Sequence, residues 1–362
     1  MTNYKIKFQA QDKPEFIKEL RAKVKDYFET KKISKYGNVN LVVKTVFMLS
    51  MYLLPYALMV SGVVNSLPWI FVCWVIMGMG VAGVGMGLMH DANHGSYSKS
   101  RKTNRFLGYS LYILGGFPAN WQYQHNTMHH GYTNIDGHDE DIDPGPFLRI
   151  SPHKPLYKIH RIQHWYAWFF YGLMTLSWAT LKDFRQLFRY KREGAVLSSS
   201  ESYGLLLFKL IIMKALYYFF LLVLPIMILP IPWYLVLLGF LAMQVTSGLI
   251  LAVIFQTAHV VPATEYPQPD KNGTMENNWA IHQLMTTSDF APKNRLLSWL
   301  IGGLNYQVEH HLFPNISHVH YRKISHFVQN LAEKYNLPYH VQPTFIRAVG
   351  SHARMLKALG RN

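Results

Sequence analysis

Three short groups of histidines are the residues of this sequence whose types and spacing suit chemistry. His90 and His94 are four positions apart, so in a helix both imidazoles point from one face toward one place. Two more groups carry a doubled histidine, and these are His125, His129 and His130, and Gln307, His310 and His311. Imidazole binds iron, copper, zinc and nickel. The grouping therefore predicts a metal site without selecting the metal.

The number of grouped histidines favours two metal ions over one. The groups hold two, three and two histidines, seven in all, whereas a structural zinc site uses four protein ligands and a catalytic one three. Cys73 is the only cysteine and lies in an apolar run, so the ligands must be nitrogen or oxygen. No H-E-x-x-H motif is present, which argues against a zinc protease.

Long apolar segments must position these groups. A membrane-spanning helix needs about 20 apolar residues, and four segments qualify: 42–64, 68–89, 209–230 and 233–257. The short breaks between the first two and the last two predict two helical hairpins. Lys214 lies within the third segment and is expected near an end or facing protein. We therefore expect an all-α integral membrane protein with four transmembrane helices in two hairpins.

Charge predicts the orientation of these hairpins. The chain has 36 Lys and Arg against 20 Asp and Glu, a net charge of +16, and the basic residues lie mostly between the apolar segments. Such residues mark the cytoplasmic side, and they favour anionic lipid headgroups over nucleic acid as a partner. Both termini and all three histidine groups fall on that side, which predicts a cytoplasmic helical cap carrying the metal site.

We divide the chain into a cytosolic amphipathic segment 1–40, a membrane domain 41–325 and a cytosolic tail 326–362. The helix predicted at 14–33 is expected to lie on the membrane surface, the alternative being a helix packed on a domain. No cleavable signal peptide is expected in the polar first segment. Two apolar stretches are too short to span and predict re-entrant or interfacial helices, at 106–118 and 165–181. Glycines of the second span predict close helix packing, at Gly78, Gly80, Gly83, Gly85 and Gly87.

With these three boxes placed between hairpins, the chain resembles the membrane fatty acid desaturases over roughly residues 40–325. Further matches run from Trp121 through the second box to Thr133 and Asn134, then to Gly137, the acidic run 139–143 and Leu312-Phe313-Pro314. Gln307, which opens the third box, is similar to the glutamine of front-end desaturases and of related bacterial acyl desaturases. Front-end enzymes insert a double bond between an existing one and the carboxyl end.

The resemblance implies two non-haem iron ions, O2 as co-substrate and two electrons for a cis double bond in an acyl chain, carried by coenzyme A or by a lipid. Electrons are expected from a separate ferredoxin or from cytochrome b5 with its reductase, because the chain has no H-P-G-G haem motif. The alternative within this chemistry is a di-iron hydroxylase of an alkane, sterol or carotenoid. A metal transporter or sensor is disfavoured, since it is expected to place ionisable residues inside the spans.

The resemblance also implies roles for single residues. The metal ligands are expected to be His90, His94, His125, His129, His130, His282, His310 and His311. His282 enters because the family uses a histidine between the last span and the third box. Possible ligands, or residues that hold a ligand or a water, are Gln307, His259, Asn278, Asp91, Asn126, Glu309, Asp139, Asp141 and Asp143. The alternative for the acidic run is a solvated loop. Trp121 is a candidate for lining the substrate tunnel.

Overall fold

The computed structural model describes residues 6–195, 197 and 201–361 and is mostly helical. Its contacts divide the chain into two compact units, neither of which is continuous in sequence. The first unit comprises Met1–Asn38, Gln124–Ala167 and Ile254–Asn362. The second unit comprises Val39–Tyr123 and Trp168–Val253. The second and third histidine boxes thus belong to the first unit, and the first box belongs to the second.

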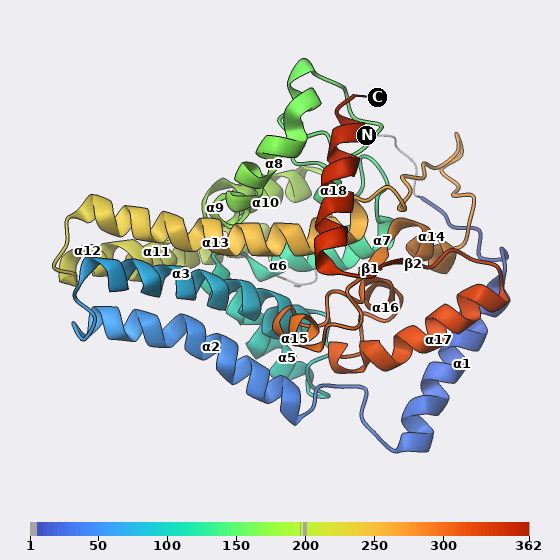
Figure 1. Ribbon diagram of the computed structural model, residues 1–362, viewed down its shortest axis with the longest axis horizontal. Helices are drawn as coiled ribbons and strands as arrows, with labels where there is room; N and C mark the ends of the chain where they lie inside the picture. The colour runs from blue at the N-terminus through green and yellow to red at the C-terminus, as the bar shows by residue number, and fades with distance from the viewer. Residues whose placement is uncertain (1–5, 196, 198–200, 362) are drawn as a thin grey trace. The chain divides into compact units, whose positions relative to one another are not determined.

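Among the described residues, four helices are long and apolar enough to cross a membrane, as predicted (Figure 1). They run over Val39–Val60, Leu67–Asn93, Tyr203–Ile228 and Trp233–His259. The first helix ends four residues earlier than expected, before a turn in which Gly62 has a positive φ of 76°. The third begins six residues earlier than expected, because Ser202 caps it by accepting a hydrogen bond from the Leu205 amide.

Two of these helices contain further labelled segments. The first is α2 (Val39–Val60), and the second consists of α3 (Leu67–Gly83), the π-helix η1 (Val84–Met89) and α4 (His90–Asn93). The third consists of α11 (Tyr203–Tyr218), the π-helix η7 (Phe219–Val223) and α12 (Leu224–Ile228), and the fourth is α13 (Trp233–His259). The second helix therefore continues past residue 89, and His90 lies within its last turn instead of after it.

Glycines let α3 approach its neighbours closely, as the sequence predicted. A Cβ atom added at Gly78 would lie 2.6 Å from the Met243 carbonyl oxygen of α13, and one at Gly80 would lie 2.7 Å from the Tyr52 amide nitrogen of α2. Both distances are shorter than any van der Waals contact, so a side chain at either position forces the helices apart. The small residues are thus required by packing.

The second unit contains a buried ion pair and several shorter helices. They are α5 (Arg101–Gly108), η2 (Tyr109–Leu114), α6 (Pro118–Trp121), α9 (Met174–Ser177), η6 (Trp178–Lys182) and α10 (Asp183–Arg192). Lys214 of α11 lies 2.6 Å from the Asp183 carboxylate and 2.5 Å from the Gly115 carbonyl oxygen, and it also donates to the Trp178 carbonyl. The lysine therefore faces protein, in agreement with the prediction.

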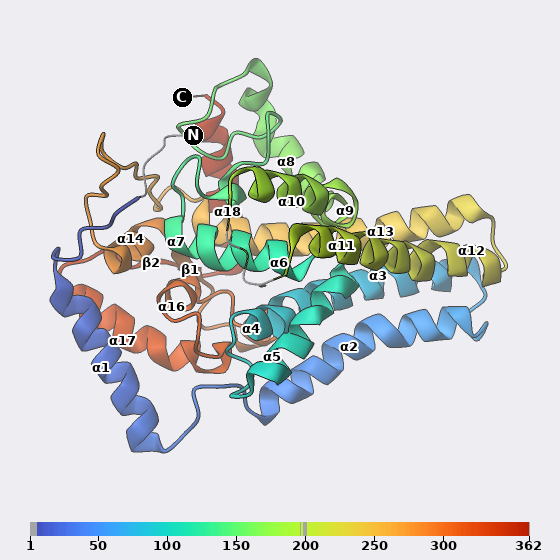
Figure 2. The same cartoon turned by 180° about the vertical axis from the view of Figure 1, so that it is seen from behind.

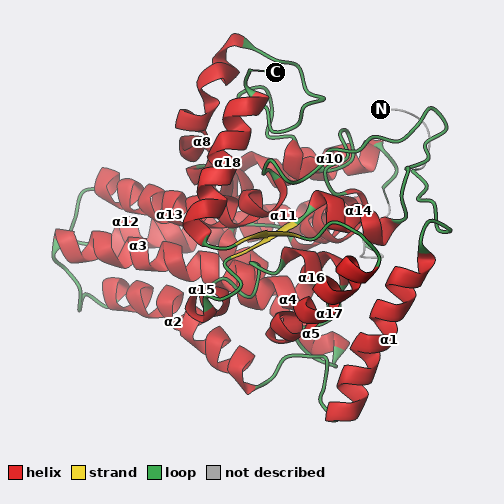
Figure 3. Ribbon diagram, turned by 45° about the vertical axis from the view of Figure 1, so that its right-hand side comes forward, coloured by secondary structure: helices red, strands yellow, loops and turns green. Residues whose placement is uncertain are grey.

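The first unit is built from helices around one short parallel sheet. Two strands pair, β1 (Ser288–Phe290) and β2 (His340–Gln342), with Asp289 opposite Val341 (yellow in Figure 3). The longer helices are α1 (Pro14–Lys31), α14 (Trp279–Thr286), α17 (Tyr321–Lys334) and α18 (Phe345–Leu359). The shorter ones are η3 (Gln122–His129), α7 (His130–Tyr132), η4 (Glu140–Ile142), η5 (Lys158–Ile162), α15 (Arg295–Leu300), α16 (Gln307–Leu312) and η8 (His318–His320), and α8 (Gln163–Gly172) begins in this unit.

The amphipathic helix α1 packs within the first unit, where a membrane-surface position was expected. Its apolar residues Phe16, Leu20 and Val24 are buried in a core shared with α14, α16 and α17, and α1 lies along α17 in both views (Figure 2). The apolar stripe of α17 meets that of α1, so burial between helices removes both from water. The apolar face of α1 is therefore used within the protein, as the alternative of a packed helix has it.

Candidate metal centre

Most of the second histidine box lies on a π-helix. His125 and His129 belong to η3, and His130 begins α7. Residues four apart lie on one side of a helix, and the rings of His125 and His129 stack with centroids 5.3 Å apart. Single π turns recur at functional sites. This one directs several imidazoles toward one place.

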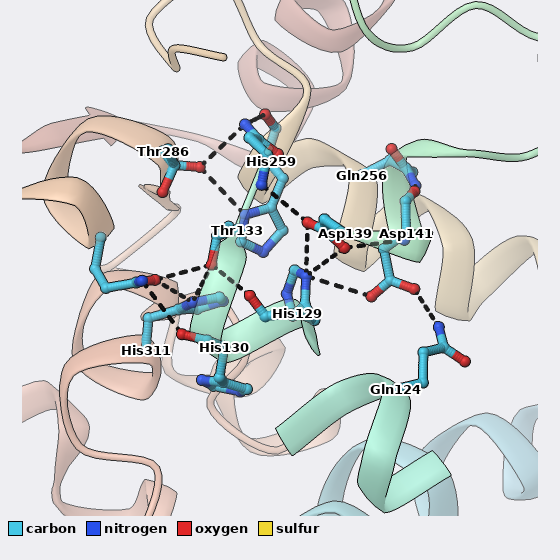
Figure 4. A network of polar contacts seen from close by, with 12 residues as sticks. Gln124, His129, His130, Thr133, Asp139, Asp141, Gln256, His259, Thr286 and His311 are labelled. Atoms are coloured by element: carbon cyan, nitrogen blue, oxygen red, sulfur yellow. Dashed lines mark hydrogen bonds and ion pairs between the residues drawn. The ribbon is translucent and has the colours of Figure 1, made fainter. Parts of the chain in front are cut away.

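The second and third boxes meet inside the first unit. One ring nitrogen from each of His129, His259 and His311 lies within 4.8 Å of the others, and all three side chains are buried. His130 lies with its ring centroid 4.5 Å from that of His310 and 4.4 Å from that of His311. Figure 4 shows His129, His130, His259 and His311 gathered near Thr133. The histidines of two boxes and the last residue of α13 therefore form one cluster.

Several of these rings are held through Nδ1 by an oxygen. The Nδ1 of His129 lies 3.1 Å from Asp139 Oδ2, and that of His259 lies 3.3 Å from the Thr286 carbonyl oxygen. In the third box, His311 Nδ1 lies 2.8 Å from Gln283 Oε1, and His310 Nδ1 lies 3.1 Å from the Tyr321 hydroxyl. An acceptor at Nδ1 keeps the proton there, so the lone pair on Nε2 is available to a metal ion. The donor set fits a transition metal such as iron.

A buried carboxylate gives this cluster its charge. Asp139 accepts hydrogen bonds from the backbone amides of Asn134 at 2.9 Å and Asp141 at 3.0 Å, besides its contact with His129. Burial opposes a charge on His129, but the Asp139 carboxylate outweighs it and raises the pKa of His129 to about 9. Burial likewise opposes a charge on Asp139, but His129 and the two amides keep the pKa of Asp139 below its usual value. Without metal, His129 is therefore an imidazolium paired with a carboxylate.

The rest of the acidic run divides into two parts. Asp141 Oδ2 lies 3.5 Å from His129 Nδ1, and the Asp141 carboxylate accepts a 2.5 Å hydrogen bond from Gln124 (Figure 4). Asp143 is exposed and pairs with Lys154 at 2.9 Å. Asp139 and Asp141 thus contact a box histidine, whereas the alternative of a solvated loop holds for Asp143.

The first box forms its own pair of rings in the second unit. His90 and His94 have ring centroids 4.6 Å apart, and Trp121 lies 6.0 Å from the first and 5.8 Å from the second. Asp91 is buried, with a carboxylate oxygen 4.0 Å from His90 Nδ1. The rings point to one place from the end of the second apolar helix, as their spacing predicted, and Trp121 borders them.

His282 and Asn278 are not brought into the cluster. His282 donates through Nε2 to the Thr133 carbonyl oxygen at 2.8 Å, and burial lowers the pKa of His282 to about 4. Asn278 caps α14, where its side-chain oxygen accepts from the Ala280 and Ile281 amides. A capping residue turns its side chain back to the helix start, so spacing alone did not predict its direction. His282 Nε2 is thus bound to a backbone oxygen, and the converging ring nitrogens include that of His259, which the sequence offered as a further candidate.

Three more candidates flank the boxes. Glu309 is buried but faces away from the cluster: its carboxylate and that of Asp289 lie 3.1 and 2.9 Å from the Tyr339 hydroxyl. Burial raises the pKa of Asp289 to about 6 and that of Glu309 well above its usual value. The expected contact between Glu309 and a ligand is therefore corrected. Gln307 is buried beside His259, and Asn126 is half-buried on η3.

The residues that hold the third box carry no signal in the sequence patterns. Gln283 and Tyr321 each bind the Nδ1 atom of a doubled histidine, and neither stands at a fixed spacing from its partner. Gln283 does follow His282 directly, so the sequence pointed to this segment but not to Gln283.

Comparisons with known proteins agree with this site. The sequence model of the family described as fatty acid desaturase matches residues 66–343. The "sn-1 linoleoyl-lipid 6-desaturase" of Arthrospira platensis is 34% identical over 348 residues, covering 96% of this chain and 93% of that protein. A protein of the same name from Synechocystis sp. is 32% identical, covering 100% and 99%.

A plant relative is similar over the same range. The "Acyl-lipid (8-3)-desaturase" of Physcomitrium patens is 33% identical, covering 98% of this chain and 74% of that protein. The resemblance first seen in the three boxes is thereby confirmed over nearly the whole length. Together with four membrane-length helices and a buried histidine cluster, these matches show that the chain belongs to the fatty acid desaturase family of oxidoreductases.

Proposed function

We propose that this protein introduces a cis double bond into an acyl chain of a membrane lipid, using a non-haem di-iron centre. The observation that carries the proposal is the cluster of His129, His259 and His311, whose ring nitrogens face one another within 4.8 Å. Imidazole nitrogens that converge from three separate segments are a donor set suited to a transition-metal ion.

The proposed ligands are the seven box histidines with His259 in place of His282: His90, His94, His125, His129, His130, His259, His310 and His311. His90 and His94 are proposed as ligands from the sequence of the first box alone. For the others, support comes from their burial in one cluster. Gln307 is proposed to contact a ligand or a bound water beside His259.

Two iron ions bound here would supply, with O2, two electrons and two protons, the removal of two hydrogens from adjacent methylenes that no side chain can perform, leaving an alkene and two water molecules. The chain's own residues orient and enclose this chemistry. Asp139, Gln283, Tyr321 and the Thr286 carbonyl fix the rings through Nδ1. Burial of the cluster excludes bulk water, which protects reactive species from side reactions. The position of the double bond then follows from which methylene is held at the site.

The names of the relatives support a lipid-linked substrate. The two cyanobacterial proteins are named for a linoleoyl lipid and position 6, and the third for an acyl lipid. We extend this to the present chain and propose that its substrate is a polyunsaturated acyl chain on a glycerolipid, desaturated on its carboxyl side. The proposed electron donor is a separate ferredoxin or cytochrome b5. Trp121, beside the first box, is proposed to border the acyl chain.

We further propose that the four apolar helices form two transmembrane hairpins and that both termini and the histidine boxes are cytoplasmic, with the division 1–40, 41–325 and 326–362 as the order along the chain. The distribution of Lys and Arg supports this orientation.

Labelling of single cysteines tests this topology. Cys73 is the only cysteine, so a Cys73→Ser background accepts one new cysteine at a time. Ser61→Cys places it in the exposed turn after α2, and Lys357→Cys places it at an exposed position of α18. An impermeant thiol reagent applied outside intact cells should label the first variant and not the second. The reverse pattern, or labelling of both, would contradict the proposed orientation.

Fatty-acid methyl-ester analysis tests the activity. A host that lacks polyunsaturated lipids is fed linoleate and expresses either the intact protein or His129→Ala, together with a competent electron donor. The proposal predicts a triunsaturated product that depends on His129 and appears first in the glycerolipid fraction. Hydroxylated lipids instead would assign the alternative reaction to the same site, and a product that appears first in the acyl-CoA pool would refute the lipid substrate.

A further inference from the structure

Helix α14 contributes none of the proposed ligands, yet one of its faces touches most of the elements that carry them. The residues on this face are Trp279, His282, Gln283 and Thr286, at positions i, i+3, i+4 and i+7. Residues with this spacing share one side of a helix. The opposite side carries Ala280 and Leu284, which are buried in the core with α1, α16 and α17.

The face of α14 binds the second box through its backbone. Trp279 donates through Nε1 to the His130 carbonyl oxygen at 3.0 Å, and Gln283 donates to the same oxygen at 3.3 Å. One turn further along the box, His282 donates to the Thr133 carbonyl oxygen at 2.8 Å. Three side chains of one helix thus hold the carboxyl end of the π-helical box and the turn after it.

The same helix also binds a histidine of the third box and His259, the last residue of α13. Gln283 Oε1 accepts from His311 Nδ1 at 2.8 Å, and the Thr286 carbonyl oxygen lies 3.3 Å from His259 Nδ1. The Thr133 hydroxyl lies 2.9 Å from Gln283 Oε1 and 2.7 Å from the His129 carbonyl oxygen. Gln283 therefore connects the second box to the third box through its two amide atoms, and it is fully buried.

We propose that α14 is the positioning element of the metal centre, and that Gln283 on this helix sets the direction of His311 relative to the second box. This proposal rests on the proposed function, because it requires the histidine cluster to bind metal. His282 becomes a positioning residue, acting through the Thr133 carbonyl. Partners of this kind set the tautomer, direction and basicity of a ligating imidazole, and their loss commonly lowers metal affinity by about 10–100-fold.

The chain offers a matched control for Gln283. Gln163 is also a fully buried glutamine of the first unit, but its amide binds only the backbone of Arg149 and Leu356. Replacing either glutamine by methionine keeps the length and volume of the side chain and removes its hydrogen bonds. Both variants lose buried bonds, and only one loses a bond to a histidine of the cluster.

Metal binding gives a readout independent of desaturation. Full-length wild type, Gln283→Met, Gln283→Glu and Gln163→Met are purified in detergent, iron per protein is measured by mass spectrometry, and Co²⁺ is titrated with the visible spectrum recorded. We expect Gln283→Met to bind Co²⁺ about 10–100-fold more weakly with shifted visible bands. Gln283→Glu, which retains an acceptor for His311 Nδ1, should recover most of the affinity, and Gln163→Met should bind as wild type does.

A fourth variant tests the role of His282. Glutamine places its amide nitrogen near the position of histidine Nε2, so His282→Gln retains a donor to the Thr133 carbonyl, and the proposal predicts wild-type iron content. Loss of iron in His282→Gln would make this residue a ligand and overturn its positioning role.

Other outcomes separate the inference from the proposed function. Wild-type metal affinity and spectrum in Gln283→Met, or equal losses in Gln283→Met and Gln163→Met, overturn the positioning role while leaving desaturation intact. Metal binding that depends on Gln283 in a protein that forms no unsaturated product supports the positioning role and refutes the proposed function. A folded wild type that binds neither iron nor Co²⁺ overturns both.

Discussion

Two groups of buried polar side chains, one in each unit, make their contacts in different ways. In the second unit, Lys214 directs its ammonium group to the Asp183 carboxylate and to the carbonyl oxygens of Gly115 and Trp178. Three donors meet three acceptors, so the group is complete in itself. In the first unit, the ring nitrogens of His129, His259 and His311 converge on one another.

This difference distinguishes a cluster with a structural role from a candidate binding site. A buried ion pair with all its hydrogen bonds made can hold helices together and needs nothing further. Ring nitrogens that converge from separate segments form a set of ligands for a cation, which the ion pair does not. The two clusters should therefore respond differently to substitution and to metal.

The largest effect is expected from the cluster itself. His259→Ala removes a nitrogen from the converging set, so we expect loss of iron and no detectable unsaturated product, measured by metal analysis and methyl-ester profiling. His352→Asn is a suitable control, because His352 is buried in the first unit but its Nδ1 binds the Val260 carbonyl oxygen at 2.8 Å. Full activity in His259→Ala would remove this residue from the ligand set.

The ion pair should affect stability and leave metal binding alone. Lys214→Met leaves the buried Asp183 carboxylate unpaired, which costs about 3–5 kcal/mol of unfolding free energy. Thermal unfolding in detergent measures the loss, and iron per folded protein should stay at the wild-type value. The double variant Lys214→Met/Asp183→Asn should recover much of the stability.

The matched control for the ion pair lies on the same helix. Lys209 pairs with Glu201 at 2.6 Å in a more exposed position, so Lys209→Met should cost only about 0–1 kcal/mol. Equal losses in the two single variants would contradict the distinction between a buried and an exposed pair.

Asp139 shares a feature with each cluster, because it is a buried carboxylate in an ion pair and its partner is His129, a histidine of the converging set. Asp139→Asn should weaken iron binding by about 10–100-fold, whereas Asp143→Asn, in the exposed part of the same run, should not. Metal titration distinguishes them.

The same residue predicts a pH dependence for the metal-free protein. The pKa of His129 is raised from 6.5 to about 9, so the stability from this pair is fully present below pH 6.5 and is lost as pH rises through about 9. Unfolding of the metal-free wild type should show this loss, and Asp139→Asn should not. Bound metal takes the place of the Nε2 proton, so the iron-loaded protein should lack it too.

The smallest effect at neutral pH is expected at His352. Burial lowers its pKa from 6.5 to about 4, so this histidine is neutral in the folded protein and takes up a proton on unfolding. Below pH 6.5 the unfolded chain binds a proton at this histidine more readily than the folded protein does. The free energy of unfolding therefore falls as pH drops from 6.5 toward 4, by at most about 1.4 kcal/mol per pH unit. His352→Asn keeps a donor to Val260 and cannot charge, so its unfolding should depend less on pH in this range.

Local patterns in the sequence predicted the parts that depend on composition and short spacing. The four apolar helices follow from run length, because the hydrophobic thickness of a bilayer requires a long uninterrupted apolar segment. Gly78 and Gly80 indicated close packing because a missing side chain leaves only backbone to contact. His125 and His129 indicated a shared direction because helical geometry aligns residues four apart, whether the turn is α or π.

The sequence did not determine the contacts of side chains that could turn in more than one direction. Asn278 and His282 have helical spacing, but Asn278 is the residue before the first turn and caps it. Glu309 neighbours His310 in sequence and therefore points to another side of α16, toward Asp289 and Tyr339. The apolar stripe of α1 was compatible with a membrane surface or with a protein partner, and in the structure it packs with the stripe of α17.

By itself, the sequence determined that the chain is helical, that four segments are long enough to cross a membrane, that its histidines occur in boxes and that it resembles the desaturases. Only the tertiary structure decided that His259, and not His282, joins the cluster, that Asp139 and Gln283 hold its rings, and that one face of α14 contacts three separate histidine segments. Helix formation and hydrophobic length depend on neighbours in the chain, whereas the partner of a buried nitrogen depends on which distant segments pack together.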